Sequence, residues 1–504
     1  MPDTPLPLGT LSLEMESPVP LYRQLYDGLR EAILEGRLKP DARLPSSRGL
    51  ATDLGIGRNT VVAAYEQLMA EGYLDSHIGA GTRVAKLLPD RLTGPGEMPA
   101  RKNRHSTAAP KRLLSSRGEA MQGVRRTAAN YRRGVTRPFQ HGLPDIEAFP
   151  ALLWSRLVAK HSRDPRHEPF GYEVAQGHEG LRRAIADYAA ADRGVICTPE
   201  QVIVTAGAQA ALDLAIRMLI DPGDTVWMEE PGYLGARGAL MAADADIRPV
   251  PVDQEGMRVE EAIETQPAPR LAYVTASHQF PMGSTLSLPR RLALIEHVAA
   301  SGGYVLEDDY DSEFRFAGRP IASLQGLDRG NTVVYMGTLA KTLFPAIRIG
   351  YLIVPPELAE PFSVAMRLTG HIPPAATQAA LADFIEEGHF GTHVRRVRQI
   401  YARRRAILMD ELETTLSRWL RPAPGEGGLQ LAAFLPPGTD DGKAAAAARA
   451  ADIHATALSF YRLTPGGSPG FHMGYAGVPD EELRKGAKAL AGVLEKEKIP
   501  TFRS

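Results

Sequence analysis

Apolar side chains recur at helical spacing near the start of the chain. Tyr22, Leu25, Tyr26, Leu29 and Ile33 are three or four residues apart, which places them on one face of a helix. The spacing predicts a helix that ends close to residue 35 and buries this face.

Two more helices and a hairpin are predicted before residue 86. The segment RGLATDLG can be capped by Ser46 or Ser47, and the tight turn GIG leads into RNTVVAAYEQLMAEG. Apolar positions of this third helix face the core, which leaves Arg58, Asn59 and Thr60 exposed in its first turn. The segment YLDSHIGAGTRVA predicts a hairpin with a glycine-rich tip. This order of elements is that of a winged helix-turn-helix over residues 1–85.

The pattern changes between 138 and 504. Short apolar runs, QVIVTAG, TVWMEEP, RLAYVTAS, GYVLEDDY, NTVVYMG and IRIGYLIV, alternate with helical patterns such as AQAALDLAIRML. This alternation predicts a mostly parallel sheet covered by helices.

Composition fits a protein of at least two domains. The chain has 504 residues, of which 44% are hydrophobic and 23% charged. It contains no long apolar run, and its first residues lack the pattern of a secretion signal. The single cysteine, Cys197, agrees with a reducing compartment. We therefore expect a cytoplasmic protein without a membrane span.

Residues 86–137 are predicted to be a basic linker. They show no sustained periodicity, and eleven Lys or Arg lie between 101 and 137 against one acid, Glu119. Such a run is often only solvated. Next to a DNA-binding domain it can also neutralise phosphates and release counterions, and both interpretations stay open.

The exposed first turn of the third helix suits contact with bases in a major groove. A small structural bundle with ordinary surface charges is the alternative. The segments PLYRQLYDGLREAILEGRLKPDARLPSSRGLA, GRNTVVAAYEQLMAEGYL and GAGTRV resemble the GntR family of DNA-binding domains. The resemblance implies that double-stranded DNA is contacted by Arg48, Arg58, Asn59 and Thr60, with Gly79 and Gly81 shaping the wing.

Lys341 follows the strand NTVVYMG, at an edge where α/β sheets bind ligands. Asp308 and Tyr310 end the strand GYVLEDDY, and Asp308 lies 33 residues before Lys341. A carboxylate can keep a pyridine nitrogen protonated, and a phenol can hold a ring oxygen. A solvated turn or a metal-ligand pair is the alternative for such acids. These residues are candidates for binding an aldehyde cofactor that condenses with lysine.

A phosphate site is predicted nearby. Gly207, Ala208 and Gln209 lie between the strand QVIVTAG and the helix AQAALDLA, where free N–H groups favour an anion. Arg348, seven residues after Lys341, can complete the site.

Together these motifs resemble fold-type I pyridoxal phosphate enzymes of the aspartate aminotransferase superfamily. The resemblance makes Lys341 the Schiff-base lysine, Asp308 the partner of the pyridine nitrogen and Tyr310 the ring-oxygen donor. It assigns the phosphate cup to Gly207, Ala208, Gln209, Thr338 and Arg348, and ring stacking to Tyr233. Tyr172, in PFGYEVAQGHEGLR, corresponds to a tyrosine that reaches the partner subunit's phosphate, which implies a homodimer.

Two segments depart from this pattern. In SHQFPMG, which replaces an asparagine-proline pair, His278, Gln279 or neither takes over the ring-oxygen contact. In SPGFHMGYAG, Phe471 and His472 stand where those enzymes hold the arginine that grips the substrate's carboxylate. Completed transamination is therefore in doubt.

A winged helix joined by a basic linker to an aminotransferase-like domain resembles the MocR/GabR family of bacterial transcriptional regulators. The resemblance implies a head-to-tail homodimer that binds an operator and senses an amine or amino-acid effector, or pyridoxal phosphate itself, at Lys341. The large domain would then complete at most part of a transamination. The alternatives are a working aminotransferase with a DNA-binding head, and a regulator whose large domain only dimerises.

Overall fold

The computed structural model describes residues 13–15, 17–77, 81–86, 114–123, 136–163, 174–316, 322–425 and 427–502. The chain divides into two compact units, Met1–Lys111 and Arg112–Ser504. Most of the predicted basic linker lies outside the described residues. Within those residues, no helix is long and apolar enough to cross a membrane.

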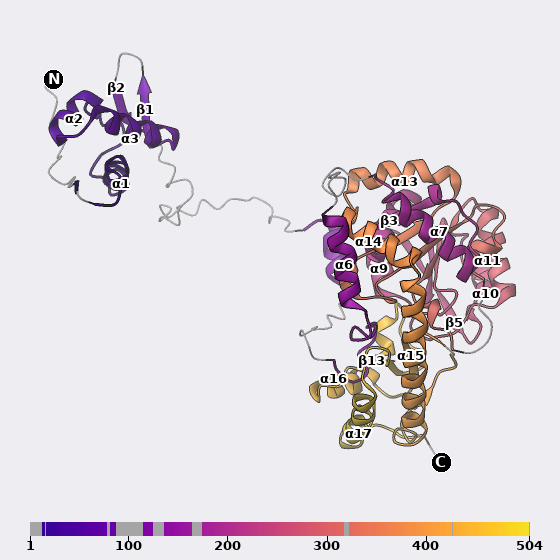
Figure 1. Cartoon of the computed structure of the whole chain (residues 1–504). Helices are drawn as coiled ribbons and strands as arrows, with labels where there is room; N and C mark the ends of the chain where they lie inside the picture. The colour runs from indigo at the N-terminus through magenta and orange to yellow at the C-terminus, as the bar shows by residue number, and fades with distance from the viewer. Residues whose placement is uncertain are drawn as a thin grey trace, which may run out of the picture. The chain divides into compact units, whose positions relative to one another are not determined.

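The first unit has the predicted order of elements (Figure 1). Helices α1 (Leu21–Leu34), α2 (Ser47–Leu54) and α3 (Arg58–Ala70) precede the antiparallel strands β1 (Leu74–His77) and β2 (Gly81–Val84). The Ser46 hydroxyl accepts the Gly49 N–H and so caps α2. Leu25, Leu50 and Leu68 are fully buried in a shared core. The prediction for Tyr22 is wrong, because its side chain is 41% exposed at the start of α1.

The linker prediction missed one helix. Helix α5 (Ser116–Gly123) belongs to the second unit and lies next to α9 (Leu234–Ala242). Its sequence SRGEAMQG carries no apolar face, so periodicity gave no signal. The available signals were Ser115, whose hydroxyl accepts the Gly118 N–H, and Glu119 in the first turn.

The second unit is built on a mixed eight-stranded sheet in the order β3-β10-β9-β8-β7-β4-β5-β6. Strands β4, β5, β7, β8 and β9 pair in parallel, whereas β10 is antiparallel to both neighbours and β6 is antiparallel to β5. The mostly parallel sheet predicted from the sequence is thus confirmed at its centre. The strands are β3 (Val202–Thr205), β4 (Thr225–Glu230), β5 (Asp246–Asp253), β6 (Gly256–Met257), β7 (Leu271–Val274), β8 (Tyr304–Asp309), β9 (Val333–Thr338) and β10 (Gly350–Ile353).

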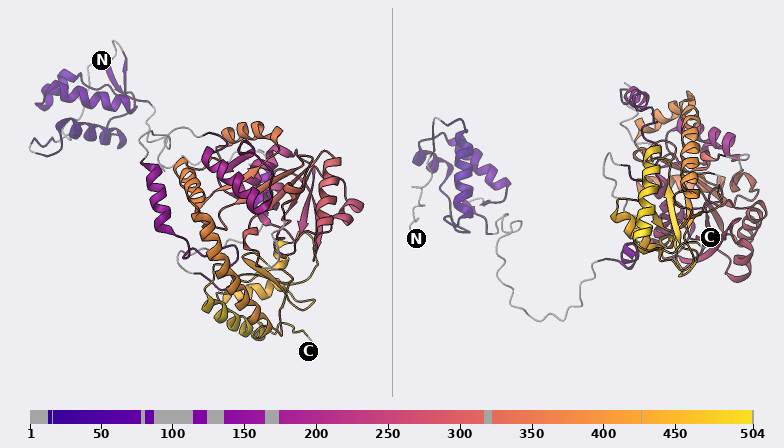
Figure 2. Two further views of the ribbon diagram at one scale, coloured as in Figure 1. Left: turned by 45° about the vertical axis from the view of Figure 1, so that its right-hand side comes forward. Right: turned by 90° about the horizontal axis from the view of Figure 1, so that it is seen from below.

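Helices cover both faces of this sheet (Figures 1 and 2). Side chains of α8, α9 and α13 share a core with one face, while α7, α14, α10 and α11 share cores that include the alternate strand residues. Their bounds are α6 (Ala151–Ser162), α7 (Glu179–Arg193), α8 (Ala208–Leu219), α10 (Val259–Thr265), α11 (Leu288–Ala300), α12 (Leu324–Leu327), α13 (Pro356–Thr369) and α14 (Ala375–Glu386). Short 3₁₀ turns span Pro199–Gln201, Ser312–Phe314, Pro345–Ile347 and Leu458–Tyr461.

The C-terminal part adds a second, four-stranded antiparallel sheet in the order β11-β12-β14-β13. It packs with the long helix α15 and with α17 around a separate apolar core. The elements are α15 (His389–Glu413), β11 (Arg421–Pro422), β12 (Gln430–Phe434), α16 (Asp441–Ala450), β13 (Thr456–Ala457), β14 (Gly470–Gly474) and α17 (Asp480–Lys496).

Candidate functional site

A cavity of about 320 Å³ lies where β7, β8 and β9 end. This is the edge at which α/β sheets bind ligands. It brings together nine of the ten residues that the sequence predicted around Lys341, and the tenth, Tyr172, lies outside the described residues. The nine are Gly207, Ala208, Gln209, Tyr233, Asp308, Tyr310, Thr338, Lys341 and Arg348.

Lys341 lies in the loop after β9, and its Nζ donates a hydrogen bond of 2.8 Å to the carbonyl oxygen of Gly142. Burial lowers the pKa of Lys341, although the negative charges of Asp311 and Asp308 act in the opposite direction. A lysine whose pKa is lowered is more often present as the nucleophilic free amine. Lys341 therefore has the properties of a reactive amine.

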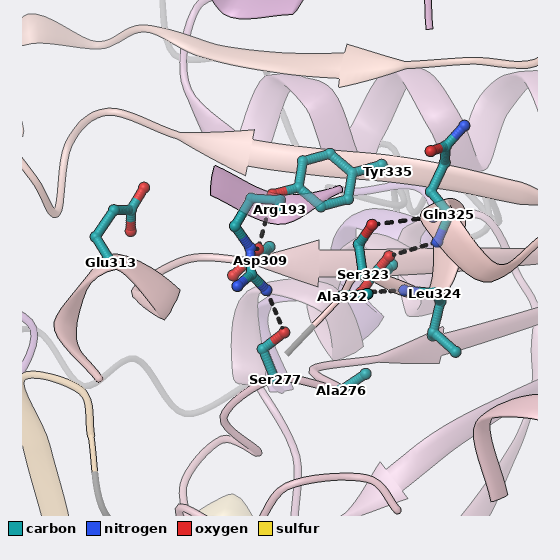
Figure 3. A network of polar contacts seen from close by, with 12 residues as sticks. Arg193, Ala276, Ser277, Asp309, Glu313, Ala322, Ser323, Leu324, Gln325 and Tyr335 are labelled. Carbon is teal, nitrogen blue, oxygen red and sulfur yellow. Dashed lines mark hydrogen bonds and ion pairs between the residues drawn. The ribbon is translucent and has the colours of Figure 1, made fainter. Parts of the chain in front are cut away.

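The two acids at the end of β8 have different environments because neighbouring strand residues point to opposite faces. Asp308 lines the cavity and accepts the Tyr273 hydroxyl at 2.6 Å. Asp309 accepts Nε of Arg193 at 2.6 Å and the Tyr335 hydroxyl at 2.7 Å, within the network of Figure 3. Asp309 is thus neutralised by its own arginine, and Asp308 is the carboxyl group that faces a ligand.

Asp308 is buried and forms no ion pair with the described residues, although the charge of Lys341 acts on it. Burial raises its pKa to about 7, against the effect of the Tyr273 hydrogen bond. Among the described residues, no lysine, arginine or histidine lies within ion-pair distance of its oxygens. A ligand with a positively charged N–H group would supply the ion pair that this buried carboxyl group lacks.

Tyr310 is oriented by residues of the segment SHQFPMG. Its hydroxyl lies 3.0 Å from Nδ1 of His278, and that nitrogen also lies 3.0 Å from an oxygen of Asp311. Gln279 donates to the carbonyl oxygens of Pro231 and Phe280. Neither His278 nor Gln279 lines the cavity, whereas Phe280 does. His278 therefore acts on the cavity through Tyr310.

The N-terminal end of α8 also lines the cavity. Gly207 precedes the helix at φ 93°, a conformation that favours glycine, and leaves the first N–H groups of α8 free of side-chain caps. Arg348 lines this end, and a Cβ at Gly207 would lie 3.9 Å from its guanidinium carbon. A helix N-terminus next to an arginine is an environment for a phosphate group.

Several residues that line the cavity were not predicted from the sequence. His141, Thr275, Gln430 and Tyr461 line the cavity. They come from the segment before α6, the loop after β7, the start of β12 and the 3₁₀ turn before β14. The signal for Thr275 was its place near the end of the predicted strand RLAYVTAS. No local pattern placed the other three at the cavity, because they come from segments that are distant in the sequence from β7, β8 and β9.

Of the two residues that replace the expected arginine, His472 lies next to the cavity wall. Its Nδ1 is 3.0 Å from the Tyr461 hydroxyl, and its ring is fully buried on β14. Phe471 belongs to the apolar core of the C-terminal part.

The predicted DNA-contacting residues lie together in the first unit. Arg58 and Asn59 are exposed in the first turn of α3, Arg48 is exposed on α2, and Thr60 is half-buried. Among the described residues, no acid pairs with Arg48 or Arg58. Gly81 begins β2 at φ 80°, and Gly79 lies outside the described residues.

Comparison with known proteins agrees with both units. The model of the bacterial regulatory proteins of the gntR family matches residues 21–84, and the model of aminotransferase class I and II matches residues 158–490. The chain thus combines a winged helix of the gntR class with an aminotransferase fold.

Relatives that align with nearly the whole chain are named as regulators. The chain is 44% identical to the probable rhizopine catabolism regulatory protein MocR of Rhizobium meliloti, over 95% of both chains. It is 32% identical to the HTH-type pyridoxine biosynthesis transcriptional regulator PdxR of Corynebacterium glutamicum, over 94% of this chain and 96% of that one. The chain belongs to the MocR-type family of transcriptional regulators.

Solved aminotransferases share the fold of the second unit. An archaeal alanine:glyoxylate aminotransferase is 27% identical with a TM-score of 0.69, covering 76% of this chain and 98% of that one. The α-aminoadipate aminotransferase LysN of Thermus thermophilus, complexed with N-(5'-phosphopyridoxyl)-L-leucine, is 26% identical with a TM-score of 0.66, covering 76% and 95%.

Proposed function

We propose that this protein is a transcriptional regulator that binds pyridoxal phosphate in the cavity around Lys341 and uses it to sense an amine or amino-acid effector. The observation that carries the proposal is Asp308, a buried carboxyl group without an ion-pair partner among the described residues, facing the same cavity as Lys341. The remaining contacts and the comparisons support the same assignment.

The cavity fits each part of the cofactor. Asp308 would hold the protonated pyridine nitrogen, and Tyr310 would donate its hydroxyl to the ring oxygen. The N-terminus of α8, Thr338 and Arg348 would bind the phosphate, and Tyr233, which precedes α9, would stack on the ring. Lys341 would bind the aldehyde carbon. When bound, the cofactor supplies an aldehyde that condenses with amines and a ring that withdraws electrons.

The protein's own groups prepare the cavity for this ligand. Gly142 holds Nζ of Lys341, and Tyr273 fixes one oxygen of Asp308. His278 and Asp311 fix the hydroxyl of Tyr310. Because these groups are already paired, little rearrangement accompanies binding.

The first unit supplies the DNA contacts of the proposal. Arg58 and Asn59, in the first turn of α3, would contact the DNA bases. Arg48 and Thr60 would contact the DNA phosphates and so position the domain. Gly79 and Gly81 would shape the wing. The winged helix would span 1–85, the basic linker 86–137 and the aminotransferase-like domain 138–504. The protein would lie in the cytoplasm with the DNA. A head-to-tail homodimer would bring Tyr172 to the phosphate bound by the partner subunit.

A working aminotransferase with a DNA-binding head is the alternative. It is supported by the nine predicted residues that line the cavity around Lys341. It is weakened by His472, which provides a neutral side chain at the position where the superfamily resemblance expects an arginine.

Borohydride reduction tests the cofactor part of the proposal. Reduction of the full-length protein should fix pyridoxal phosphate on the peptide that contains Lys341, and Lys341→Ala should lose the visible absorbance of the bound cofactor. Lys160→Ala, which removes an exposed ammonium group on α6, is the control. A wild-type protein that takes up no cofactor supplied in excess would disprove this assignment.

Turnover separates the regulator from the enzyme. We expect specific operator binding and no sustained production of oxo acid from amino donors. Repeated turnover without specific DNA binding would favour the aminotransferase.

A further inference from the structure

We infer that the cavity selects a primary amine whose other polar groups are uncharged, such as hydroxyls, and which carries no carboxylate. The inference rests on the proposed function, because it names the class of effector for the same cavity. It follows from the wall formed by His141, Phe280, Gln430 and Tyr461, and from His472 behind that wall.

Hydrogen bonds and ring contacts fix this wall. The Tyr461 hydroxyl lies 3.0 Å from Nδ1 of His472 and 3.3 Å from Nε2 of His141. The ring centroids of His141 and His472 are 4.7 Å apart. Phe280 packs edge-on against Tyr461 and His472, with centroids 5.2 Å and 5.0 Å away. The wall is therefore a set of aromatic and imidazole rings held in place by one another.

The same wall is next to the reactive lysine. His141 precedes Gly142, whose carbonyl oxygen accepts the Lys341 Nζ hydrogen bond. Gln430 accepts the N–H of Gly142 at 3.1 Å. A small amine that reacts at the position of Nζ thus places its remaining groups close to His141 and Gln430.

Burial favours the neutral form of both imidazoles, His141 in the wall and His472 behind it. Burial lowers the pKa of His141 to about 4, and the charge of Lys341 adds to this effect. Burial lowers the pKa of His472 well below its ordinary value, with His141, His278 and Lys341 acting in the same direction. The wall offers hydrogen-bond donors and acceptors but no fixed positive charge.

The cations of the described lining are accounted for by the cofactor. They are Lys341, which would hold the aldehyde until the effector amine takes its place and whose pKa burial lowers, and Arg348, at the phosphate end by α8. A carboxylate placed against the wall would lose its water without gaining an ion pair. A hydroxyl group can exchange its water for hydrogen bonds to neutral imidazole, amide and phenol groups. The wall therefore discriminates by charge.

Three amines of similar size test the inference on the cofactor-loaded full chain. Serine carries a carboxylate where 2-amino-1,3-propanediol carries its second hydroxymethyl group. 2-Aminopropane carries no hydroxyl group and no carboxylate. Dissociation constants come from the change in cofactor absorbance and from calorimetry. We expect the diol to bind at least about tenfold more tightly than serine, equivalent to about 1.4 kcal/mol.

Two substitutions locate the effect. Tyr461→Phe should weaken the diol by about two- to tenfold, through loss of one hydrogen bond, and leave 2-aminopropane unchanged. Tyr304→Phe is the control, because Tyr304 begins β8 and does not line the cavity. It should change the affinity for neither amine. His472→Arg should reverse the preference toward serine. If that variant does not fold, Tyr461→Phe still decides.

Equal or tighter binding of serine to the wild-type protein would overturn the inference and leave the proposed regulator intact. An unchanged diol affinity in Tyr461→Phe would overturn it as well. Absence of cofactor uptake would instead overturn the proposed function, and this inference with it.

Discussion

The two units present their candidate residues in opposite ways. On the winged helix, Arg48, Arg58 and Asn59 are exposed, and the described acids leave both arginines unpaired. In the large unit, Lys341 and Asp308 lie in a cavity, and each is held by a neighbouring group. The exposed arginines of the winged helix lack an acidic partner in the described protein. The residues of the cavity are already positioned by hydrogen bonds within the protein before a ligand binds.

This difference follows from the ligands. DNA brings its own charges and water to a surface, so the protein needs only exposed donors at suitable spacing. A small cofactor must be enclosed, so every polar group around it needs a partner in the protein or in the ligand. Substitutions of the exposed DNA-facing residues should therefore change affinity alone, whereas those in the cavity should also change stability and pH dependence.

The largest effect is expected at Asp308. Asp308→Asn removes the charge that would hold the pyridine nitrogen, and we expect cofactor binding to weaken by about 3–5 kcal/mol, as when one partner of a buried ion pair is lost. Titration followed by absorbance measures it. Asp213→Asn, on the surface of α8, is the control and should bind normally. Normal cofactor affinity in Asp308→Asn would contradict the assignment.

The second effect tests whether the units fold separately. Leu68→Ala opens a hole in the core of the winged helix, where Leu68 is fully buried. We expect the free energy of unfolding of that unit to fall by about 2–5 kcal/mol, with cofactor uptake unchanged. Urea denaturation followed by circular dichroism and cofactor absorbance distinguishes the two transitions. Met69→Ala, at a half-buried neighbour, should cost less.

The third effect concerns base reading. Arg58→Ala should weaken binding to the operator by about 1–3 kcal/mol, with a smaller loss on random DNA. Fluorescence anisotropy at fixed salt measures both. Arg23→Ala, at an exposed arginine of α1 paired with Asp27, is the control. Equal losses on both DNAs would make Arg58 a phosphate contact.

The smallest effect is a difference in pH dependence. Burial raises the pKa of Asp308 and of Glu229 to about 7. Because the folded state holds these protons more tightly, their stabilisation is complete below the unfolded pKa of about 4 and is lost as pH rises through about 7. Buried histidines of the same unit, such as His141, have lowered pKa values and act in the opposite direction, so the test compares the wild type with Asp308→Asn. Without cofactor, the melting temperature of the wild-type large unit relative to that of Asp308→Asn should fall as pH rises from about 5.5 to about 8.

The winged helix should show the opposite sign. A hydrogen bond from Tyr26 lowers the pKa of Glu71, so its small contribution is present above the unfolded pKa and is lost only on acidification. Its melting temperature should change little between the same two pH values. Parallel shifts of both transitions in calorimetry would contradict this comparison.

The sequence was sufficient for the order of elements and for residues next to strand ends. Periodicity located α1 and α3, and Lys341 and Asp308 were found because they follow β9 and end β8. The helix α5 was missed because SRGEAMQG has no apolar face, and Tyr22 was misplaced because the helical face turns to solvent at the first turn of α1.

The cavity wall could not be predicted, because it depends on long-range packing. Tyr461, His472 and His141 meet only after β13 and β14 pair and the segment before α6 folds against them. Spacing along the chain carries no information on such contacts. The superfamily resemblance identified the exceptional position of His472 but not the neighbours that make it neutral.

The most direct test of the sensor claim is operator affinity measured with and without an amine that changes the cofactor spectrum. For the cofactor-loaded wild-type protein, we predict that such an amine changes operator affinity by about tenfold or more, since coupling of about 1–3 kcal/mol is typical between linked sites. In Lys341→Ala the same amine should have no effect. An amine that shifts the spectrum and is turned over repeatedly, while operator affinity stays constant, would contradict the account and identify the protein as an enzyme.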